Sequence, residues 1–487
     1  MNAVNGSAVE RLAGARVLVL NWRDVRHPLA GGAEQYIHQI SRRWVSAGVH
    51  VSWLTARPSG QPAYETVDGI HVMRAGGDLT LYPRAALRLR QSRSDYDAII
   101  DCQNGIPFFA PAFVGSTVPV VQVVHHVHQD QFATRFSPPM AAIGRFLEGR
   151  VARAVYGSRA TAAVSPSTRV ELRRRLGFTG PIFVVPNGTI DVPTLSGPRD
   201  PDPTLVVVTR LVQHKRVDLL LGEIATVARR VPRLRVEIVG DGPERRRLQG
   251  LVVDLGLQWT VTMHGYLPDA TRDALLQRAW LTTSTSAAEG WGCSIIEAAA
   301  WGVPCVALRV PGVRDSVVEG VTGWLVERPV DFRDVLVAAL RELAVEDRAR
   351  EIVAACQAWA RCFSWDRSSE LLAGVLLDEA GRTARTASGA RQRRNARPDI
   401  ATVATFARRD TVDWSGRLRA TDQVVVDDDR VTLLLNGCDD FDAAAVLRRH
   451  GVLDATTRLA TREDLLAGPA AAPHGRPGLD RAPAGPR

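Results

Sequence analysis

The feature that most constrains this chain is a repeated alternation of short β-branched runs with amphipathic segments, from Arg16 to about Leu377. This alternation is typical of βα units stacked around a parallel sheet. It occurs as two series. The first predicts strands at Val17–Asn21, Val49–Thr55, Ala98–Asp101, Val120–Val124, Thr161–Val164 and Ile182–Val185, and the second at Leu205–Thr209, Leu234–Val239, Val261–His264, Leu281–Thr285 and Val303–Ala307. We therefore predict an α/β fold in which two Rossmann-like β/α/β domains face a cleft.

A proline-rich stretch separates the two series. Pro186–Pro203 holds five prolines and two glycines, and it has too few apolar residues to form an element of a core. We interpret this stretch as a hinge, which places the first domain at 16–190 and the second at 204–362.

The composition changes after Ala380. Residues 381–398 contain six arginines and no acidic residue, and a segment of this kind buries too little apolar surface to order itself. The sequence therefore predicts a flexible linker over 381–399. Residues 468–487 are rich in proline, alanine and glycine, which predicts a disordered tail.

Between the linker and the tail, residues 400–467 have the pattern of a small folded unit. Val424–Val426 and Val431–Leu435 flank four polar residues as the two strands of a hairpin would, and Asp440–His450 has a helical pattern. We predict a small accessory domain here. We also expect the residues after Ala380 to be dispensable for the chemistry of the two larger domains.

The net charge of the chain limits the classes of partner that it is expected to bind. The 487 residues carry a formal net charge of +9, which favours anionic partners such as nucleotide phosphates, nucleic acid or an anionic lipid surface. Only one of the 61 basic residues is a lysine, Lys215. The composition thus marks one position, but it does not choose among the partners.

Cysteine usage and hydropathy indicate the compartment. The six cysteines show no CxxC or Cys/His metal spacing, so we expect neither a metal site nor a disulfide. No run of eighteen apolar residues occurs, and the first fifteen residues lack an apolar core of signal-peptide length. These features favour a cytoplasmic protein without a transmembrane segment.

The first candidate site is the loop Gly31-Gly32-Ala33-Glu34, between the opening strand and an amphipathic helix. Glycines there allow the backbone to approach a ligand, and the amides of a helix start attract phosphate. A tight strand-to-helix turn explains the glycines equally well. A second glycine segment, Gly240–Gly242, has Arg245 at the third position of a dinucleotide fingerprint, which disfavours a nicotinamide site.

The second candidate is the pair Arg210 and Lys215, which lies just beyond the first strand of the second series. Ligands of open parallel sheets bind outside the carboxyl ends of the strands. A guanidinium fork and a compact ammonium can divide a diphosphate between them. The alternative is a pair of cations on the surface, although the chain's only lysine lies here.

The third candidate is the segment Glu289–Glu297, a glycine-rich turn that leads into a helix after a strand. Glu289 in the loop and Glu297 on the helix could reach the same cleft, and carboxylates accept hydrogen bonds from hydroxyl-rich ligands. Gly290 and Gly292 would expose backbone amides. Either glutamate alone would more often be a solvated charge, but the pair beside Arg210 and Lys215 is much more specific.

Together these motifs resemble the retaining glycosyltransferases of the GT-B fold, specifically family 4, whose signature is two glutamates separated by seven residues. The resemblance spans about 16–380. Further segments support it in the same order: Ser165–Ser167, Val185–Asp191, Gly240–Pro243, His264–Tyr266 and Thr322–Val326. Phe363–Asp366 and the helix after it, over 363–380, resemble the family's last helix, which packs back on the first domain.

The resemblance implies a role for each residue of the second-domain site. Arg210 and Lys215 would bind the donor diphosphate and stabilise the charge that develops as it leaves. Glu297 would hold the ribose hydroxyls, and Glu289 would face the donor sugar. The loop residues that would contribute backbone amides are Gly290, Trp291, Gly292 and Cys293.

The resemblance also implies a first-domain contribution to the site. Gly31 and Gly32 match the loop that closes on the diphosphate. His125, directly after the strand Val120–Val124, matches the family's active-site histidine. His126 is the alternative, because a shift of one residue would exchange the two.

The implied activity is transfer of a hexose from a nucleoside diphosphate sugar to a glycan, lipid-linked or small-molecule acceptor, with retention of anomeric configuration. No metal or cofactor would be required, since the donor phosphate would help to deprotonate the acceptor hydroxyl. GDP- and UDP-linked donors both stay open. The Glu-Gly-Trp-Gly loop resembles that of mannosyltransferases.

Two other classes of function fit parts of the sequence. A sugar phosphorylase or a nucleotide-sugar epimerase can share the GT-B fold. A non-catalytic binder of membrane or nucleic acid would explain the arginines interleaved with leucines at Arg84–Arg93 and Arg169–Arg175, although solvated helix faces also have this pattern. Because the site residues are intact, we expect an enzyme that binds no nucleic acid and that can also contact an anionic membrane.

Overall fold

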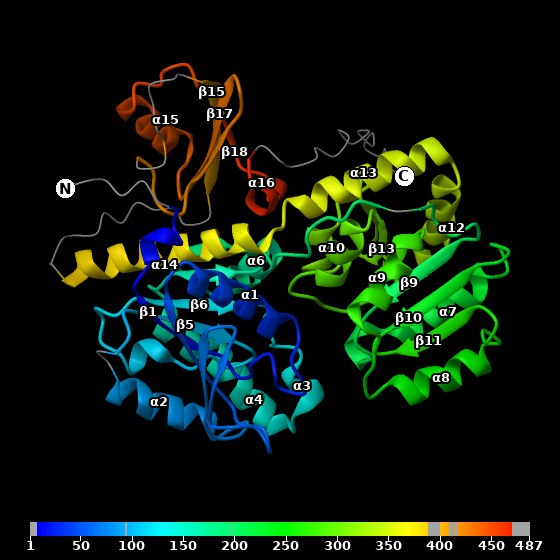
Figure 1. Ribbon diagram of the computed structural model, residues 1–487, viewed down its shortest axis with the longest axis horizontal. Helices are drawn as coiled ribbons and strands as arrows, with labels where there is room; N and C mark the ends of the chain where they lie inside the picture. Colours follow the sequence, from blue (N-terminus) through cyan, green and yellow to red (C-terminus); the bar gives the residue numbers. More distant parts are fainter. Residues whose placement is uncertain are drawn as a thin grey trace, which may run out of the picture. The chain divides into compact units, whose positions relative to one another are not determined.

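The computed structural model describes residues 7–92, 95–195, 197–387, 400–408, 414 and 417–469. Their contacts divide them into two compact units (Figure 1). Unit 1 comprises the described residues up to Gly188 together with those from Trp365 onward, and unit 2 is Thr189–Ser364. The division falls inside Pro186–Pro203, whose described residues form neither helix nor strand.

Unit 1 is built on an eight-stranded sheet in the order β3-β4-β2-β1-β5-β6-β7-β8. The strands are β1 (Arg16–Leu20), β2 (His50–Thr55), β3 (Tyr64–Val67), β4 (Ile70–Arg74), β5 (Ala98–Gln103), β6 (Val120–Val124), β7 (Thr161–Ala163) and β8 (Ile182–Val184). All pairs are parallel except β3 with β4. The order from β4 onward is Rossmann-like, and it reverses between β1 and β5.

The β3–β4 hairpin was missed by the sequence analysis. Its two-residue turn, Asp68–Gly69, has positive φ at both positions, 49° and 79°. An Asp-Gly pair is a strong signal for such a turn. The hairpin adds an antiparallel edge to an otherwise parallel sheet.

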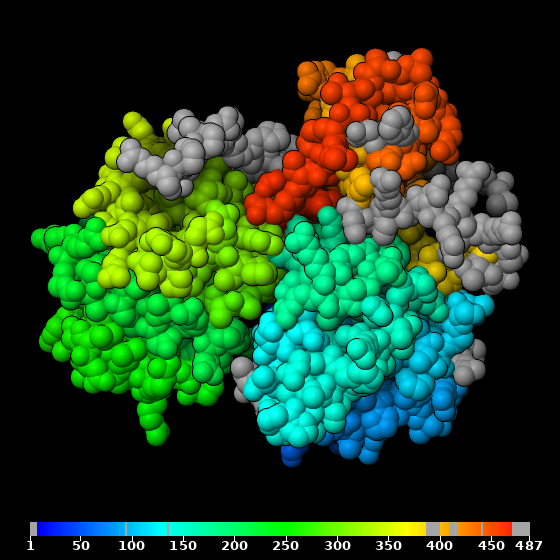
Figure 2. All heavy atoms as spheres, turned by 180° about the vertical axis from the view of Figure 1, so that it is seen from behind, coloured from blue at the N-terminus to red at the C-terminus, as the bar shows by residue number. Residues whose placement is uncertain are grey.

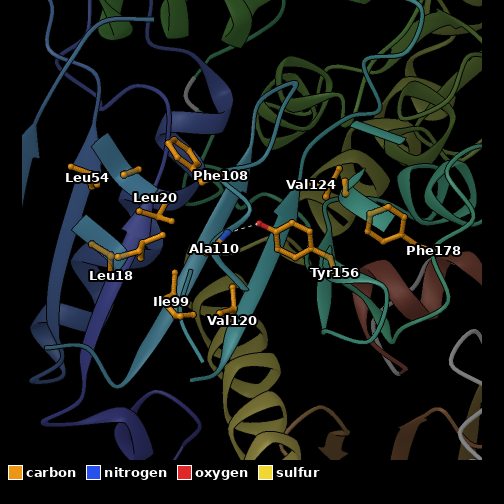
Figure 3. Close-up of a cluster of buried hydrophobic side chains, with 14 of the residues drawn as sticks. Leu18, Leu20, Leu54, Ile99, Phe108, Ala110, Val120, Val124, Tyr156 and Phe178 are labelled. Atoms are coloured by element: carbon orange, nitrogen blue, oxygen red, sulfur yellow. Dashed lines mark hydrogen bonds between the residues drawn. The ribbon is translucent and has the colours of Figure 1, made fainter. Parts of the chain in front are cut away.

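The core of unit 1 lies between this sheet and its helices. Leu18 and Leu20 of β1, Ile99 of β5 and Val120 of β6 are almost fully buried and point into one cluster (Figure 3). The hydroxyl of Tyr156 accepts a hydrogen bond from the Ala110 N–H at 3.2 Å. Burial of such an aliphatic side chain is worth about 1.5–3 kcal/mol, so this cluster fixes the positions of the strand ends.

Helices connect the strands of unit 1. They are η1 (Glu10–Leu12), α1 (Gly32–Ser46), α2 (Leu81–Gln91), η2 (Ala110–Ala112), α3 (Phe132–Arg135), α4 (Pro138–Phe146), the π-helical turn η3 (Leu147–Val151), α5 (Ala152–Tyr156), α6 (Pro166–Arg174) and α14 (Trp365–Ala387). Helix α6 begins after Ser165, whose hydroxyl accepts the Thr168 N–H and so caps the helix.

Helix α14 continues into the predicted linker. Glu379 is buried and accepts the Ala160 N–H at 3.2 Å and the Arg382 Nε–H at 2.7 Å, and Thr383 is buried one turn later. These contacts order the chain beyond Ala380. The prediction of a flexible segment is therefore wrong for 381–387, while 388–399 lie outside the described residues.

The carboxyl-terminal residues form a four-stranded antiparallel sheet in the order β16-β17-β15-β18. Its elements are β15 (Ala401–Ala407), β16 (Gln423–Val426), β17 (Arg430–Asn436), α15 (Asp440–Arg449), β18 (Thr456–Leu459) and α16 (Arg462–Ala467). The predicted hairpin and helix are confirmed, whereas β15 and β18 were missed. The predicted tail lies outside the described residues from 470 onward.

This carboxyl-terminal sheet packs against the rest of unit 1. Arg367 of α14 donates to the Gln423 side chain at 2.9 Å and to the Leu466 carbonyl. A Cβ on Gly374 would lie 2.2 Å from the Ala420 carbonyl oxygen, so the backbones are in close contact. In Figure 2 the red atoms of α16 meet the turquoise surface of α6. This packing argues against the expectation that these residues are dispensable.

Unit 2 is built on six parallel strands, β9 (Thr204–Val208), β10 (Arg235–Val239), β11 (Val261–Gly265), β12 (Thr282–Ser284), β13 (Cys305–Leu308) and β14 (Gly323–Val326). They form two three-stranded sheets, β11-β10-β9 and β12-β13-β14. Backbone bonds from Val206 N to Leu281 O and from Trp280 N to Thr204 O join the two. The resulting Rossmann order reverses between β9 and β12, where ligands of such sheets bind.

The helices of unit 2 are η4 (Gln213–Lys215), α7 (Val217–Val227), α8 (Arg245–Asp254), α9 (Asp269–Arg278), α10 (Cys293–Ala300), α11 (Val313–Ser316), η5 (Pro329–Asp331), α12 (Phe332–Leu343) and α13 (Glu346–Arg361). Strand β14 was not among the predicted strands, although its residues belong to the Thr322–Val326 motif. The other five strands of unit 2 were predicted from their β-branched runs.

Candidate active site

The loops after β9 and β12 lie side by side at the point where the strand order of unit 2 reverses. The Ala287 N–H donates to the His214 carbonyl at 2.8 Å. The Thr285 hydroxyl donates to the carbonyls of Lys215 at 3.1 Å and Arg216 at 2.9 Å. These bonds bring together the second and third candidate motifs, which are more than seventy residues apart in sequence.

Lys215 and Glu289 form an ion pair in this structure. Each side chain is 17% exposed, so both remain accessible to a ligand. Arg210, five residues earlier, is exposed and forms no ion pair with any described residue. The site therefore combines one available guanidinium with an ammonium that a ligand phosphate could take over from a carboxylate.

Glu297 lies on α10, one helical turn after Cys293. Burial raises its pKa above the ordinary range, and the Arg272 guanidinium opposes this shift. Its carboxylate accepts no hydrogen bond from any described side chain. The side chain is only partly buried, so its carboxylate oxygens remain available to accept hydrogen bonds from ligand hydroxyls.

The glycine-rich loop before α10 is partly occupied by the protein's own contacts. The Gly292 N–H donates to the Ser316 hydroxyl at 2.9 Å, and a Cβ at this position would lie 2.7 Å from that oxygen. Trp291 is buried against the Phe363 ring, with centroids 5.1 Å apart. The Gly292 amide is thus engaged within the protein and the Trp291 ring holds the loop through packing, while the donor contacts of both residues stay predictions.

Gly290 and Cys293 are the other two loop residues predicted to bind the donor. Helix α10 begins at Cys293, and the first amides of a helix have no partner within it. Burial raises the pKa of the Cys293 thiol to about 12, so this side chain is neutral. Any donor contact from this segment would therefore come from the backbone.

The Gly240–Gly242 segment supports the loop that carries Arg210. Cβ atoms on these two glycines would lie 1.9 Å from the Thr209 carbonyl oxygen and 2.3 Å from that of Leu211. The Leu211 N–H also donates to the Asp241 carbonyl at 2.9 Å. The glycines thus allow two backbones to approach closely.

A small polar cavity opens beside the ion pair. Besides Lys215 and Glu289, its lining includes the hydroxyl side chains Thr209, Thr283, Ser284, Ser286 and Ser294. The sequence analysis missed these hydroxyls. Their position at the carboxyl end of a strand was the only available signal, because serine and threonine are common in such loops.

In unit 1, Gly31 and Gly32 lie at the start of α1. The Gly31 N–H donates to the Glu34 carboxylate at 2.7 Å, and Glu34 is buried and paired with Arg23 at 3.2 Å. The Gly31 amide is thus capped by Glu34 in this structure, and its contact with a donor phosphate stays a prediction. Gly32 is the first residue of the helix.

The two histidines follow β6 directly. His125 packs edge-on against Tyr36 with ring centroids 4.9 Å apart, and its Nε2 has no hydrogen-bond partner among the described residues. Burial lowers the pKa of His125 to about 3, so it is neutral at physiological pH. The His126 ring lies 4.5 Å from that of His128. Both histidines stay candidates for the active-site role.

The described residues show neither a metal-binding cluster nor a membrane-spanning helix. No cluster of three or more His, Cys, Asp or Glu side chains there is arranged to hold a metal ion. No helix in the same residues is long and apolar enough to span a membrane.

The chain matches known proteins over most of its length. Residues 30–192 match the family model Glycosyltransferase Family 4, and residues 195–355 match the model Glycosyl transferases group 1. The GDP-mannose-dependent alpha-(1-6)-phosphatidylinositol monomannoside mannosyltransferase of Mycobacterium tuberculosis is 30% identical over 71% of this chain and 78% of that protein. The UDP-N-acetylglucosamine--peptide N-acetylglucosaminyltransferase GtfA subunit of Streptococcus parasanguinis is 31% identical over 34% of this chain, which spans only 32% of that relative.

A solved structure of sucrose-phosphate synthase from Thermosynechococcus elongatus superposes with a TM-score of 0.60 at 20% identity, covering 77% of this chain and 100% of that one. This similarity concerns the fold. The two Rossmann-like units and the matched models define a GT-B glycosyltransferase, an enzyme that transfers a sugar from a nucleotide-sugar donor. Within that class, the chain belongs to glycosyltransferase family 4.

Proposed function

We propose that this enzyme transfers mannose from GDP-mannose to a lipid-linked acceptor with retention of anomeric configuration. The Lys215–Glu289 pair beside the exposed Arg210 is the observation that carries the donor site. Similarity to a GDP-mannose-dependent enzyme over 71% of the chain supports the choice of donor and acceptor class. Similarity to a relative named for UDP-N-acetylglucosamine makes UDP-sugars the comparison in every test.

In this proposal, binding of the donor breaks the Lys215–Glu289 ion pair and gives each side chain a new partner. Its phosphate oxygens bind Arg210 and Lys215, which releases Glu289 to accept a hydrogen bond from a sugar hydroxyl. Glu297 accepts the ribose hydroxyls. The two cations then stabilise the charge that grows on the diphosphate as its bond to the anomeric carbon breaks.

The transfer step balances without a further reactant. The acceptor oxygen bonds to the anomeric carbon on the face that the diphosphate leaves, and the acceptor proton passes to the departing phosphate. The products are the glycoside and the nucleoside diphosphate. A phosphorylase would form a sugar phosphate instead, and an epimerase would return a nucleotide sugar.

Product analysis tests this function. We expect the wild-type chain to release GDP in proportion to glycoside when supplied with GDP-mannose and a phospholipid-linked acceptor, with little turnover of UDP-sugars. Lys215→Ala and Glu289→Ala should abolish most turnover, whereas Arg350→Ala, an exposed arginine on α13 of unit 2, should not. Equal turnover in all three variants would refute the site. NMR of the new glycosidic bond would refute retention if its anomeric configuration were inverted.

A second part of the proposal concerns the acceptor's location. Four large apolar side chains between α3 and η3 are about half exposed: Phe136 (45%), Met140 (45%), Ile143 (55%) and Phe146 (53%). The only acidic residue from 136 to 155 is Glu148, which is buried, whereas Arg150 and Arg153 are exposed. An apolar face flanked by exposed arginines fits an anionic lipid surface.

The arginine-rich segments chosen from the sequence have a different surface. Leu89 and Leu172 point into the core, so the helices around them mainly expose arginines. Leu87 at 57% exposure and Val170 at 38% are the exceptions. We therefore assign membrane contact to the α4 face.

Vesicle sedimentation tests this assignment. We expect the wild-type chain to bind vesicles that contain phosphatidylglycerol, to release at high salt, and to ignore neutral vesicles. The double substitution Ile143→Ser with Phe146→Ser should abolish binding, and Leu87→Ser should not. Binding that survives the α4 substitutions but is lost with Leu87→Ser would move the surface back to α2.

A further inference from the structure

Glu148 is a fully buried carboxylate in unit 1, and neither the donor site nor the proposed transfer step uses it. It lies in the π-helical turn η3 between α4 and α5 and is 0% exposed. Turns of this kind inside a helix are rare and occur often at functional sites. No lysine or arginine among the described residues pairs with it, so hydrogen bonds must compensate its burial.

Three hydrogen-bond donors surround this carboxylate, and the Nδ1 atom of the His128 ring lies 3.5 Å from its Oε1. Oε1 accepts the His128 N–H at 2.6 Å and the Gln103 side-chain amide at 3.2 Å. Oε2 accepts the Gln129 side-chain amide at 2.7 Å. Gln103 in turn accepts the amide of Gln122 at 2.6 Å, so the network continues into the middle of the sheet.

The network ties one loop to two strands. His128 and Gln129 belong to the segment that follows β6 and begins with the two candidate histidines. Gln103 is the last residue of β5. Glu148 therefore holds the backbone of this segment at His128, three residues after His125. It does so from η3, which begins more than twenty residues after His125.

We propose that Glu148 is a positioning residue that holds the His125–Gln129 segment in place for sugar transfer. This inference rests on the proposed function, because it assumes that sugar transfer uses one of the two candidate histidines at the start of this segment. Glu148 itself touches neither donor nor acceptor. Its effect passes through the backbone of His128 and the side chain of Gln129.

The chemistry of the network explains why a carboxylate is needed. All three partners are donors, and an ionised carboxylate accepts on both oxygens. A carboxamide has one acceptor oxygen, so Glu148→Gln would turn an N–H toward the amide of Gln129 and lose that bond. Gln129→Glu would restore the contact with position 148, because the new carboxylate could accept from the amide there, but it would give up the 3.2 Å bond that the Gln129 amide donates to the Arg145 carbonyl.

The experiment compares Glu148→Gln with Glu379→Gln in the full chain. Glu379 is also 0% exposed in unit 1, and it accepts the Ala160 N–H without contacting the histidine segment. We expect Glu148→Gln to lower kcat about 10- to 100-fold with an unchanged KM for the donor. Adding Gln129→Glu should recover about tenfold of that loss. Glu379→Gln should lower the melting temperature, because it weakens the pairing with Arg159 and Arg382, and should leave kcat unchanged.

A second readout does not depend on activity. Amide hydrogen exchange in residues 125–131 should accelerate in Glu148→Gln, return toward wild type in the double variant, and stay slow in Glu379→Gln. Unchanged exchange and unchanged kcat in Glu148→Gln would overturn the proposal. So would equal losses of kcat in both single variants. If the wild-type chain transferred no sugar at all, the proposed function would fail, while the exchange measurement would still decide whether Glu148 holds the loop.

Discussion

Two glutamates, one in each unit, show how burial and partners assign different tasks to the same side chain. Glu289 is partly exposed and paired with Lys215, so both charges can exchange their partner for a ligand. Glu148 is fully buried among three amide donors and the His128 ring, and no described lysine or arginine pairs with it. The first arrangement suits a site that must bind and release a charged donor. The second suits a fixed support.

The same contrast applies to the cations of unit 2 and the imidazoles of unit 1. Arg210 and Lys215 are charged and reachable from solvent. His125 is held neutral by burial, with a pKa of about 3. We therefore expect unit 2 to contribute electrostatic stabilisation and unit 1 to contribute neutral hydrogen bonding.

Loss of the lysine should have the largest effect. We expect Lys215→Ala to lower kcat about 100- to 1000-fold, because it removes a cation from the leaving group. Lys215→Arg should retain part of the activity, since it keeps the charge but changes the geometry. Steady-state kinetics with the preferred nucleotide sugar measures both. A near-normal rate in the alanine variant would show that Arg210 alone serves the diphosphate.

The second largest effect should come from Glu297. Glu297→Gln should raise the KM for the donor about tenfold, because a carboxamide accepts ribose hydroxyls less strongly than a carboxylate does. The effect on kcat should be small. A lowered kcat with an unchanged KM would contradict the ribose-binding role, since Glu297 would then act in the transition state.

His125, whose Nε2 atom is buried, should make folding stability depend on pH. Its folded-state pKa of about 3 lies below the ordinary histidine value of about 6.5. The unfolded chain then binds more protons between these values, so stability falls as the pH drops below about 6.5. We expect this histidine to cost about 1–2 kcal/mol at about pH 5 relative to about pH 7.5.

Urea unfolding at both pH values would measure that cost as a difference between the wild-type chain and His125→Gln. Comparing the two proteins at the same pH cancels the contributions of other titratable groups. One such group is His38, because burial lowers its pKa as well. An identical pH dependence in the two proteins would mean that His125 is accessible enough to be protonated.

The smallest effect should come from Glu289→Gln. This change removes the carboxylate that competes with the phosphate for Lys215. The affinity for GDP should therefore increase about two- to fivefold, a factor that corresponds to the small free energy of a partly exposed ion pair. Turnover should nevertheless fall, because the contact with the donor sugar weakens. Calorimetric titration measures the affinity. Weaker binding of GDP would show that Glu289 supports the diphosphate site instead of competing for it.

Much of this architecture could be predicted from the sequence. The alternating β-branched runs identified eleven of the strands in the two Rossmann-like regions, and the spacing of the motifs identified Lys215 and Glu289, which the structure brings together. The β3–β4 hairpin was missed although its Asp68–Gly69 turn carries a clear signal. Local patterns therefore sufficed for the elements and for the charged motifs.

Other features depend on tertiary contacts that no local pattern contains. Glu148 lies in an amphipathic stretch where a glutamate is ordinarily solvated, and only its distant partners show that it is buried. The Gly292 N–H is occupied by Ser316, twenty-four residues away. Helix α14 continues past Ala380 because Glu379 is anchored to Ala160. Each of these depends on a bond between segments far apart in the chain.

The central claim is that a donor diphosphate takes Lys215 from Glu289, and the lone lysine allows a direct test. Protein labelled with ¹⁵N only in lysine carries a single side-chain ammonium, that of Lys215. Its NMR signal should shift in a saturable way when GDP is added, and guanosine, which lacks the phosphates, should leave it in place. A Lys215 signal that stays unchanged at saturating GDP would contradict the account.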